Sequence, residues 1–102
     1  MSIKKQYLKS KPICKVTFRL SATTAAEGRK AALAGDFNAW RIDQTIMKPL
    51  KNGDFTVTVD LPVGREYQYR YVIDDRLWVT DDAADKYVSS GFSDCQNSVV
   101  IV

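Results

Sequence analysis

The sequence predicts an all-β fold, an antiparallel β-sandwich formed by a single domain. Three observations predict it: apolar and polar residues alternate in several short segments, turn-forming residues separate these segments, and no segment has the period of an amphipathic helix. The 102 residues suit one hydrophobic core, since domains most often hold about 100 to 150 residues. The apolar content of 45 % and the charged content of 26 % are ordinary for a globular protein. We therefore expect six or more short strands packed as two sheets.

The strands are predicted from strict alternation or from short apolar runs. Between Cys14 and Leu20 every second residue is apolar, as in a half-buried strand. The segment around Tyr69 alternates in the same way, so its tyrosines should pack in the core and Arg70 should point to the opposite face. Strands are expected at residues 14–20, 31–35, 55–61, 67–73, 77–80 and 98–102.

Turns and loops are predicted from Asp, Asn and Gly. Asn52-Gly53 predicts a tight hairpin, because these residues tolerate positive backbone angles, and Asp74-Asp75 predicts a second turn. The remaining connections are expected as a loop over 21–30 with a helical turn at 25–27, a loop over 36–43 and an irregular segment over 81–94.

Charge is concentrated at the beginning of the chain. The net charge is +3, and residues 1–12 contain four lysines and no acidic residue. We interpret 1–12 as a basic flexible arm and 13–102 as the folded domain. Arg70 is the basic residue that accompanies the predicted aromatic strands, so a charged groove for nucleic acid is not expected. Membrane partners are not expected either, and without an apolar stretch of signal-peptide length the prediction is a cytoplasmic location.

Metal chemistry and catalysis are not predicted. The chain has two cysteines and no histidine, so it lacks the ligands of a zinc site and the usual base for a serine or cysteine nucleophile. Cys14 is in phase with the apolar residues of its strand and is expected to be a buried thiol, while the sequence leaves open whether Cys95 pairs with it. No cofactor is expected.

Several blocks of the sequence together resemble one family. The blocks are Gly35-Asp36-Phe37-Asn38-Ala39-Trp40, Tyr67-Gln68-Tyr69-Arg70-Tyr71, Asp74-Asp75-Arg76-Leu77-Trp78 and Asn97-Ser98-Val99-Val100. In order and spacing they resemble the early-set, immunoglobulin-like carbohydrate-binding module, family 48, of glycogen-branching and debranching enzymes and of the AMP-activated protein kinase beta subunit. The resemblance implies an immunoglobulin-like sandwich over about residues 13–102 that binds α-glucan without cutting it.

The resemblance also implies a site. In glycogen-binding members two tryptophans form a platform for the sugar, and a basic residue and an asparagine hydrogen-bond to it. The matching positions are Trp40, Trp78, Arg70 and Asn97, with arginine where the kinase subunit has lysine. The family's loop leucine is absent here, and Phe92 is a further candidate for that role. The expected partner is an α-glucan polysaccharide or oligosaccharide, such as glycogen, starch or maltooligosaccharide.

Each of these residues also has a structural interpretation. Trp40 and Trp78 are typical of apolar lids over a sandwich edge, Arg70 of a solvated residue paired with an Asp, and Asn97 of a residue that caps a turn. Early-set domains also dock on other proteins, so the alternative function is an interaction module for a glucan-processing enzyme or a kinase. In that case the tryptophans would be buried anchors of an interface.

Overall fold

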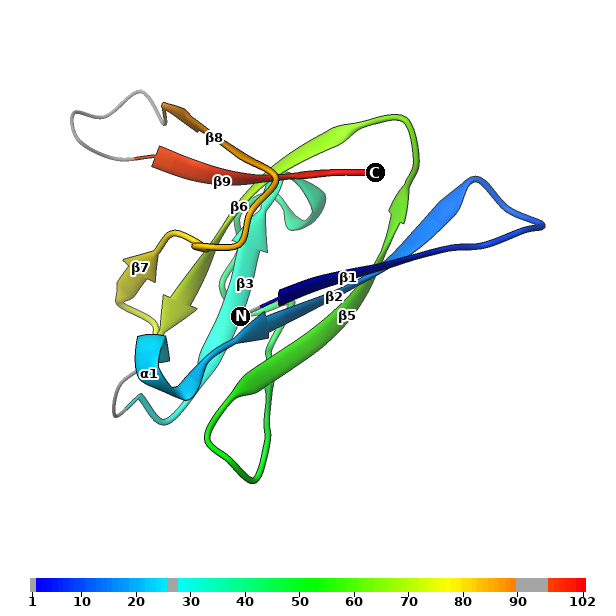
Figure 1. Ribbon diagram of the computed structural model, residues 1–102. Coiled ribbons are helices and arrows are strands. Elements are labelled where there is room, and N and C mark those ends of the chain that lie inside the picture. Colours follow the sequence, from blue (N-terminus) through cyan, green and yellow to red (C-terminus); the bar gives the residue numbers. More distant parts are fainter. Residues whose placement is uncertain (1, 26–27, 90–95) are drawn as a thin grey trace.

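Two antiparallel sheets pack face to face in the computed structural model of the chain, which describes residues 2–25, 28–89 and 96–102 (Figure 1). Sheet A has the order β1-β2-β5-β4, and sheet B has the order β3-β6-β9-β8, with β7 also paired to β6. The strands are β1 (Ser2–Tyr7), β2 (Ile13–Leu20), β3 (Ala31–Gly35), β4 (Lys48–Pro49), β5 (Phe55–Pro62), β6 (Glu66–Ile73), β7 (Leu77–Val79), β8 (Lys86–Ser89) and β9 (Gln96–Ile101). Two short helical turns, α1 (Ala22–Ala25) and η1 (Asp36–Asn38), join them. The predicted all-β, immunoglobulin-like sandwich is confirmed.

The core forms where the alternating faces of β2 and β6 meet. Cys14, Val16, Phe18 and Leu20 on β2 are fully buried, as are Tyr69 and Tyr71 on β6. The ring of Phe18 from sheet A meets the ring of Tyr69 from sheet B edge to face, with centroids 4.9 Å apart. This is a favoured arrangement of two aromatic rings. The predicted burial of the Cys14 thiol and of the β6 tyrosines is confirmed.

A buried carboxylate closes one side of the core. Asp81 is 1 % exposed, and its Oδ2 accepts hydrogen bonds from the hydroxyls of Tyr69 at 2.7 Å and Tyr71 at 3.1 Å. Burial, followed by the negative charge of Asp81, raises the pKa of both phenols. Asp81 also donates its N–H to Ser98 Oγ of β9 and accepts at its carbonyl from Tyr87 of β8. It therefore ties β6, β8 and β9 together through hydrogen bonds that satisfy a buried charge.

The prediction of a flexible arm over residues 1–12 is wrong for its first half, because Ser2–Tyr7 forms strand β1. This strand pairs along its length with β2, and Ile3 packs against the core. Its lysines lie at the edge of sheet A, where charged side chains are common because they oppose edge-to-edge aggregation. The basic composition therefore marks an edge strand here and not a mobile terminus.

Other boundaries also differ from the predictions. β8 lies in the segment expected to be irregular, and the helical turn is at Ala22–Ala25, whereas residues 26–27 of the expected turn lie outside the described residues. The Asn52-Gly53 hairpin is confirmed by the pairing of β4 with β5, but only Gly53 of the two has a positive φ, at 92°. Asn52 instead accepts a hydrogen bond at its side chain from the N–H of Asp54.

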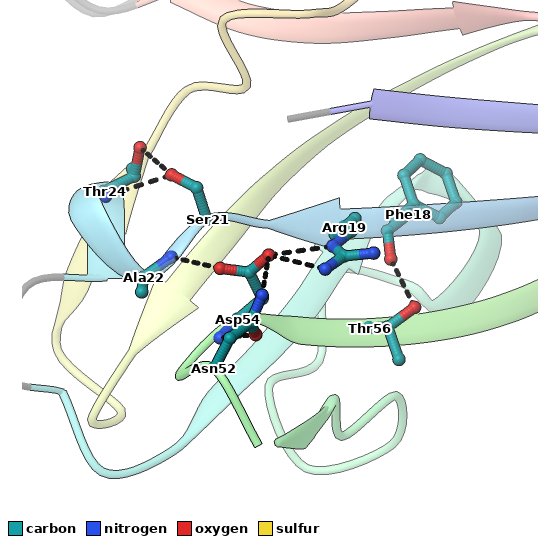
Figure 2. A network of polar contacts seen from close by, with 8 residues as sticks. All are labelled: Phe18, Arg19, Ser21, Ala22, Thr24, Asn52, Asp54 and Thr56. Atoms are coloured by element: carbon teal, nitrogen blue, oxygen red, sulfur yellow. Dashed lines mark hydrogen bonds and ion pairs between the residues drawn. The ribbon is translucent and has the colours of Figure 1, made fainter. Parts of the chain in front are cut away.

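Asp54 is the centre of a polar network that joins the end of β2, α1 and the start of β5 (Figure 2). Its Oδ1 accepts from the N–H of Ala22 at 2.7 Å, and its Oδ2 accepts from Arg19 Nε at 2.8 Å. The Ala22 N–H and then the Arg19 guanidinium lower the pKa of the Asp54 carboxyl. The charged form is therefore stabilised by folding.

Asp54→Asn should lower the melting temperature at neutral pH. As the pH is lowered, the melting temperature of the variant should fall less than that of the wild type. The pKa of Asp54 is lower in the folded state, so its contribution is present above the unfolded pKa of about 3.9 and is lost as pH falls through the folded pKa. Thermal unfolding at a series of pH values measures this. Asp60→Asn is the control, because Asp60 is exposed and pairs with Lys15 at the longer distance of 3.5 Å. Equal effects of the two substitutions would contradict the role given to Asp54.

Candidate functional site

The outer face of sheet B carries three of the predicted site residues. Because side chains alternate along β6, Gln68, Arg70 and Val72 point away from the core that holds the tyrosines. Trp78 of β7 lies directly opposite Val72, and Asn97 of β9 donates a hydrogen bond to Gln68. Arg70, Trp78 and Asn97 therefore share the outer face through the register of three paired strands.

Trp40 lies on the loop that follows β3, and Asn38 holds this loop in place. Asn38 is buried, and its Oδ1 accepts from the N–H of Gly35 at 3.0 Å. Its Nδ2 donates to the carbonyl of Leu33 at 2.8 Å and to Thr45 Oγ1 at 2.9 Å. The loop is thus fixed to its own strand and to the segment that leads toward β4.

Asp36 connects Trp40 to β6. Its Oδ1 accepts from the indole Nε1 of Trp40 at 3.1 Å, and its Oδ2 accepts from the backbone N–H of Gln68 at 2.8 Å. Trp40 has a φ of 61°, which is the left-handed region that a bulky residue rarely adopts. Such local strain concentrates at functional sites. The indole is half-buried, so one part of it stays open to solvent.

Trp78 is the more open of the two tryptophans, with 40 % of its surface exposed. It follows a turn in which Asp74 and Asp75 both have positive φ, at 53° and 62°. Asp74 Oδ1 accepts from the N–H groups of Arg29 and Lys30, which lower the pKa of the Asp74 carboxyl. This turn fixes the start of β7 and hence the place of Trp78 opposite β6.

Arg70 is half-buried on the outer face of sheet B, between Gln68 and Val72 of β6. Its Nε atom is buried without a hydrogen-bond partner, and within residues 2–25, 28–89 and 96–102 no acidic side chain forms an ion pair with it. The expected alternative, a solvated arginine paired with an Asp, is therefore not what the described part of the chain shows. A guanidinium has five N–H donors, so Arg70 can donate to a ligand on this face.

Asn97 is the most buried of the predicted residues, at 9 % exposed. It lies inside β9 and not in a turn, so the turn-capping interpretation is wrong. Its Nδ2 donates to Gln68 Oε1 at 2.9 Å. Phe92 lies outside the described residues, as does Cys95, while Cys14 is a free thiol.

Hydrogen bonds link two of the predicted site residues, Asn97 and Trp40. A chain of contacts runs from Asn97 to the side chain of Gln68, from the backbone of Gln68 to Asp36, and from Asp36 to Trp40. Sequence reasoning included Gln68, Asp36 and Asn38 in the matching blocks but gave none of them a role. Their side-chain contacts depend on how the β3 loop meets β6, and no pattern in the sequence shows that.

The described part of the chain has no group of three or more side chains suited to a metal ion. It also has no helix long and apolar enough to cross a membrane.

The fold and this face define a small β-sandwich that presents aromatic and hydrogen-bonding side chains on one sheet. A family model described as the glycogen recognition site of AMP-activated protein kinase matches residues 19–101. The chain belongs to this family of carbohydrate-binding, non-catalytic modules. A comparison with curated proteins gave no match.

Asp36→Ala should loosen Trp40 while leaving the sandwich folded, because it removes the acceptor of the indole N–H at the surface. In a Trp78→Phe background, where Trp40 is the one tryptophan, time-resolved fluorescence anisotropy should show faster local motion of the indole. The free energy of unfolding should fall by about 1 kcal/mol for the lost hydrogen bonds.

Asp43→Ala is the matched control for this prediction. Asp43 follows Trp40 in the chain and pairs with Arg41 instead of the indole. Unchanged anisotropy in Asp36→Ala, or an equal change in Asp43→Ala, would contradict the positioning role of Asp36.

Proposed function

We propose that the outer face of sheet B binds α-glucan, such as glycogen, starch or maltooligosaccharide, without catalysis. Trp40 and Trp78 would be the aromatic platform, and Arg70 and Asn97 would be hydrogen-bonding residues. The observation that carries the proposal is that neither tryptophan is buried, although both are held by the fold. Membership of a glycogen-recognition family supports the same class of ligand.

The chemistry of a pyranose suits such a face. One side of the ring exposes C–H groups that pack on an aromatic ring, and the hydroxyls around its edge require donors and acceptors. The tryptophans supply rigid apolar area at little entropic cost. Arg70 supplies donors, and Asn97 can donate and accept. Arg70 is half-buried and forms no ion pair with an acidic side chain of the described residues, so its guanidinium can donate to a sugar hydroxyl on this face.

Binding should be modest in strength. An open face gives a sugar less contact than an enclosing cavity does, so we expect binding free energies of about −4 to −8 kcal/mol, from millimolar to micromolar. Several sugar units on a branched polymer would raise the apparent affinity. The cytoplasmic location stays a prediction.

Electrophoresis in native gels that contain glycogen or amylose tests the proposal, with dextran as the non-binding polymer. The wild-type protein should be retarded, and Trp40→Ala and Trp78→Ala should each weaken binding by about tenfold, or 1.4 kcal/mol. Tyr7→Ala is the control variant, because it removes an aromatic side chain that is 56 % exposed on sheet A.

The outcomes separate the two functions under consideration. Retardation that is lost in both tryptophan variants and kept in Tyr7→Ala supports glucan binding at this face. Absence of retardation for the folded wild type would contradict it. The face would then be examined as a docking surface for a glucan-processing enzyme or a kinase, with the same tryptophans as anchors.

A further inference from the structure

Gln68 lies at the crossing point of the hydrogen bonds that connect the outer face of sheet B. Its side-chain Oε1 accepts from Asn97 Nδ2 at 2.9 Å, and its backbone N–H donates to Asp36 Oδ2 at 2.8 Å. The side chain is half-buried and lies on the same face of β6 as Arg70, two residues before it in the strand. Gln68 thus touches one predicted site residue directly and a second one, Trp40, through Asp36.

The hydrogen bond between the side-chain amides of Asn97 and Gln68 leaves one donor group and one acceptor group free for a ligand. A carboxamide has one carbonyl oxygen and one NH2 group. When Asn97 donates to Gln68, the carbonyl oxygen of Asn97 and the NH2 group of Gln68 stay available, and neither has a further hydrogen bond within the described residues. If the donor and the acceptor exchange roles, the pair still keeps one free acceptor and one free donor. The pair therefore presents complementary groups side by side.

We propose that Gln68 and Asn97 act as one unit that recognises a vicinal diol of the sugar, which makes Gln68 a further ligand-binding residue. The proposal rests on the proposed function of this face. Two neighbouring hydroxyls can donate one hydrogen bond and accept another, so they match a donor beside an acceptor. Gln68 also fixes the orientation of the largely buried Asn97, so that its remaining polar atom is preorganised before binding.

The chemistry restricts the class of glucan. A 1,4-linked glucose unit keeps its 2- and 3-hydroxyls free and adjacent, whereas a 1,3-linked unit uses the 3-hydroxyl in the chain. The amide pair would therefore discriminate against 1,3-linked glucans, whereas it would not by itself separate 1,4-linked glucans from 1,6-linked dextran, which keeps the same diol. When a 1,3-linked chain binds, one polar group of the amide pair would have no hydroxyl partner. An unsatisfied buried polar group opposes binding.

Isothermal titration calorimetry with maltoheptaose tests the proposal. Gln68→Met keeps the length of the side chain and removes both polar groups, so it should weaken binding by about five- to thirtyfold. If the two amides act as a unit, the double variant Gln68→Met/Asn97→Ala should be no more than about twofold weaker than Gln68→Met alone, because interacting residues are not additive. Gln6→Met is the matched control, since Gln6 is an exposed glutamine on β1 of sheet A.

A second ligand shows whether the hydroxyls are what is recognised. Maltoheptaose methylated at its 2- and 3-hydroxyls should bind the wild type more weakly, and Gln68→Met should change this affinity by less than about twofold, because the recognised groups are already blocked. Wild-type affinity of Gln68→Met for maltoheptaose would overturn the inference and leave the proposed function intact. An equal loss of affinity for both ligands would also overturn it, because Gln68 would then only support the surface. Failure of the wild type to bind either ligand would overturn the proposed function and this inference with it.

Discussion

Alternation along β6 is the constraint on which both the core and the proposed site depend. Its tyrosines point inward, where they meet Phe18 of the other sheet and share the buried carboxylate of Asp81. A shift of one residue in the register would expose these rings and bury Arg70. The same inward packing that stabilises the sandwich thus determines which side chains form the outer face.

β6 is supported along most of its length, because strands pair with both of its edges. β3 pairs with one edge, while β9 and then β7 pair with successive parts of the other. The place where β9 gives way to β7 is next to Arg70, so residues from three strands meet there. A site supported by paired strands is held more precisely than a site made of loops alone. Trp40 is the exception, and the bonds of Asn38 and Asp36 compensate for its position on a loop.

The fold was largely predictable because the longest strands alternate strictly. β2 and β6 each have one apolar face over most of their length, and both were predicted to within one residue at each end. β8 was missed because it is a short edge strand of sheet B within an acidic stretch, and its pairing with β9 depends on a distant segment. β1 was missed for a similar reason, since its lysines resemble a solvated terminus until β2 is placed beside them.

The site was predictable only in part. The tryptophans, Arg70 and Asn97 were found through the resemblance of whole sequence blocks, and their roles in binding stay predictions. The contacts made by Gln68 and Asp36 were not predictable, because they join residues about 30 positions apart through side-chain geometry. The left-handed conformation of Trp40 was not predictable either, since nothing in its local sequence requires it.

The most direct test of the central claim is a two-dimensional amide NMR titration of the protein with maltoheptaose. The account predicts that the largest shifts map to the indole N–H groups of Trp40 and Trp78, the side chains of Arg70, Gln68 and Asn97, and the backbone around them, while sheet A changes little. Shifts that map to β1, β2 and β5 instead, or no saturable shifts at all, would contradict the claim that the outer face of sheet B binds the glucan.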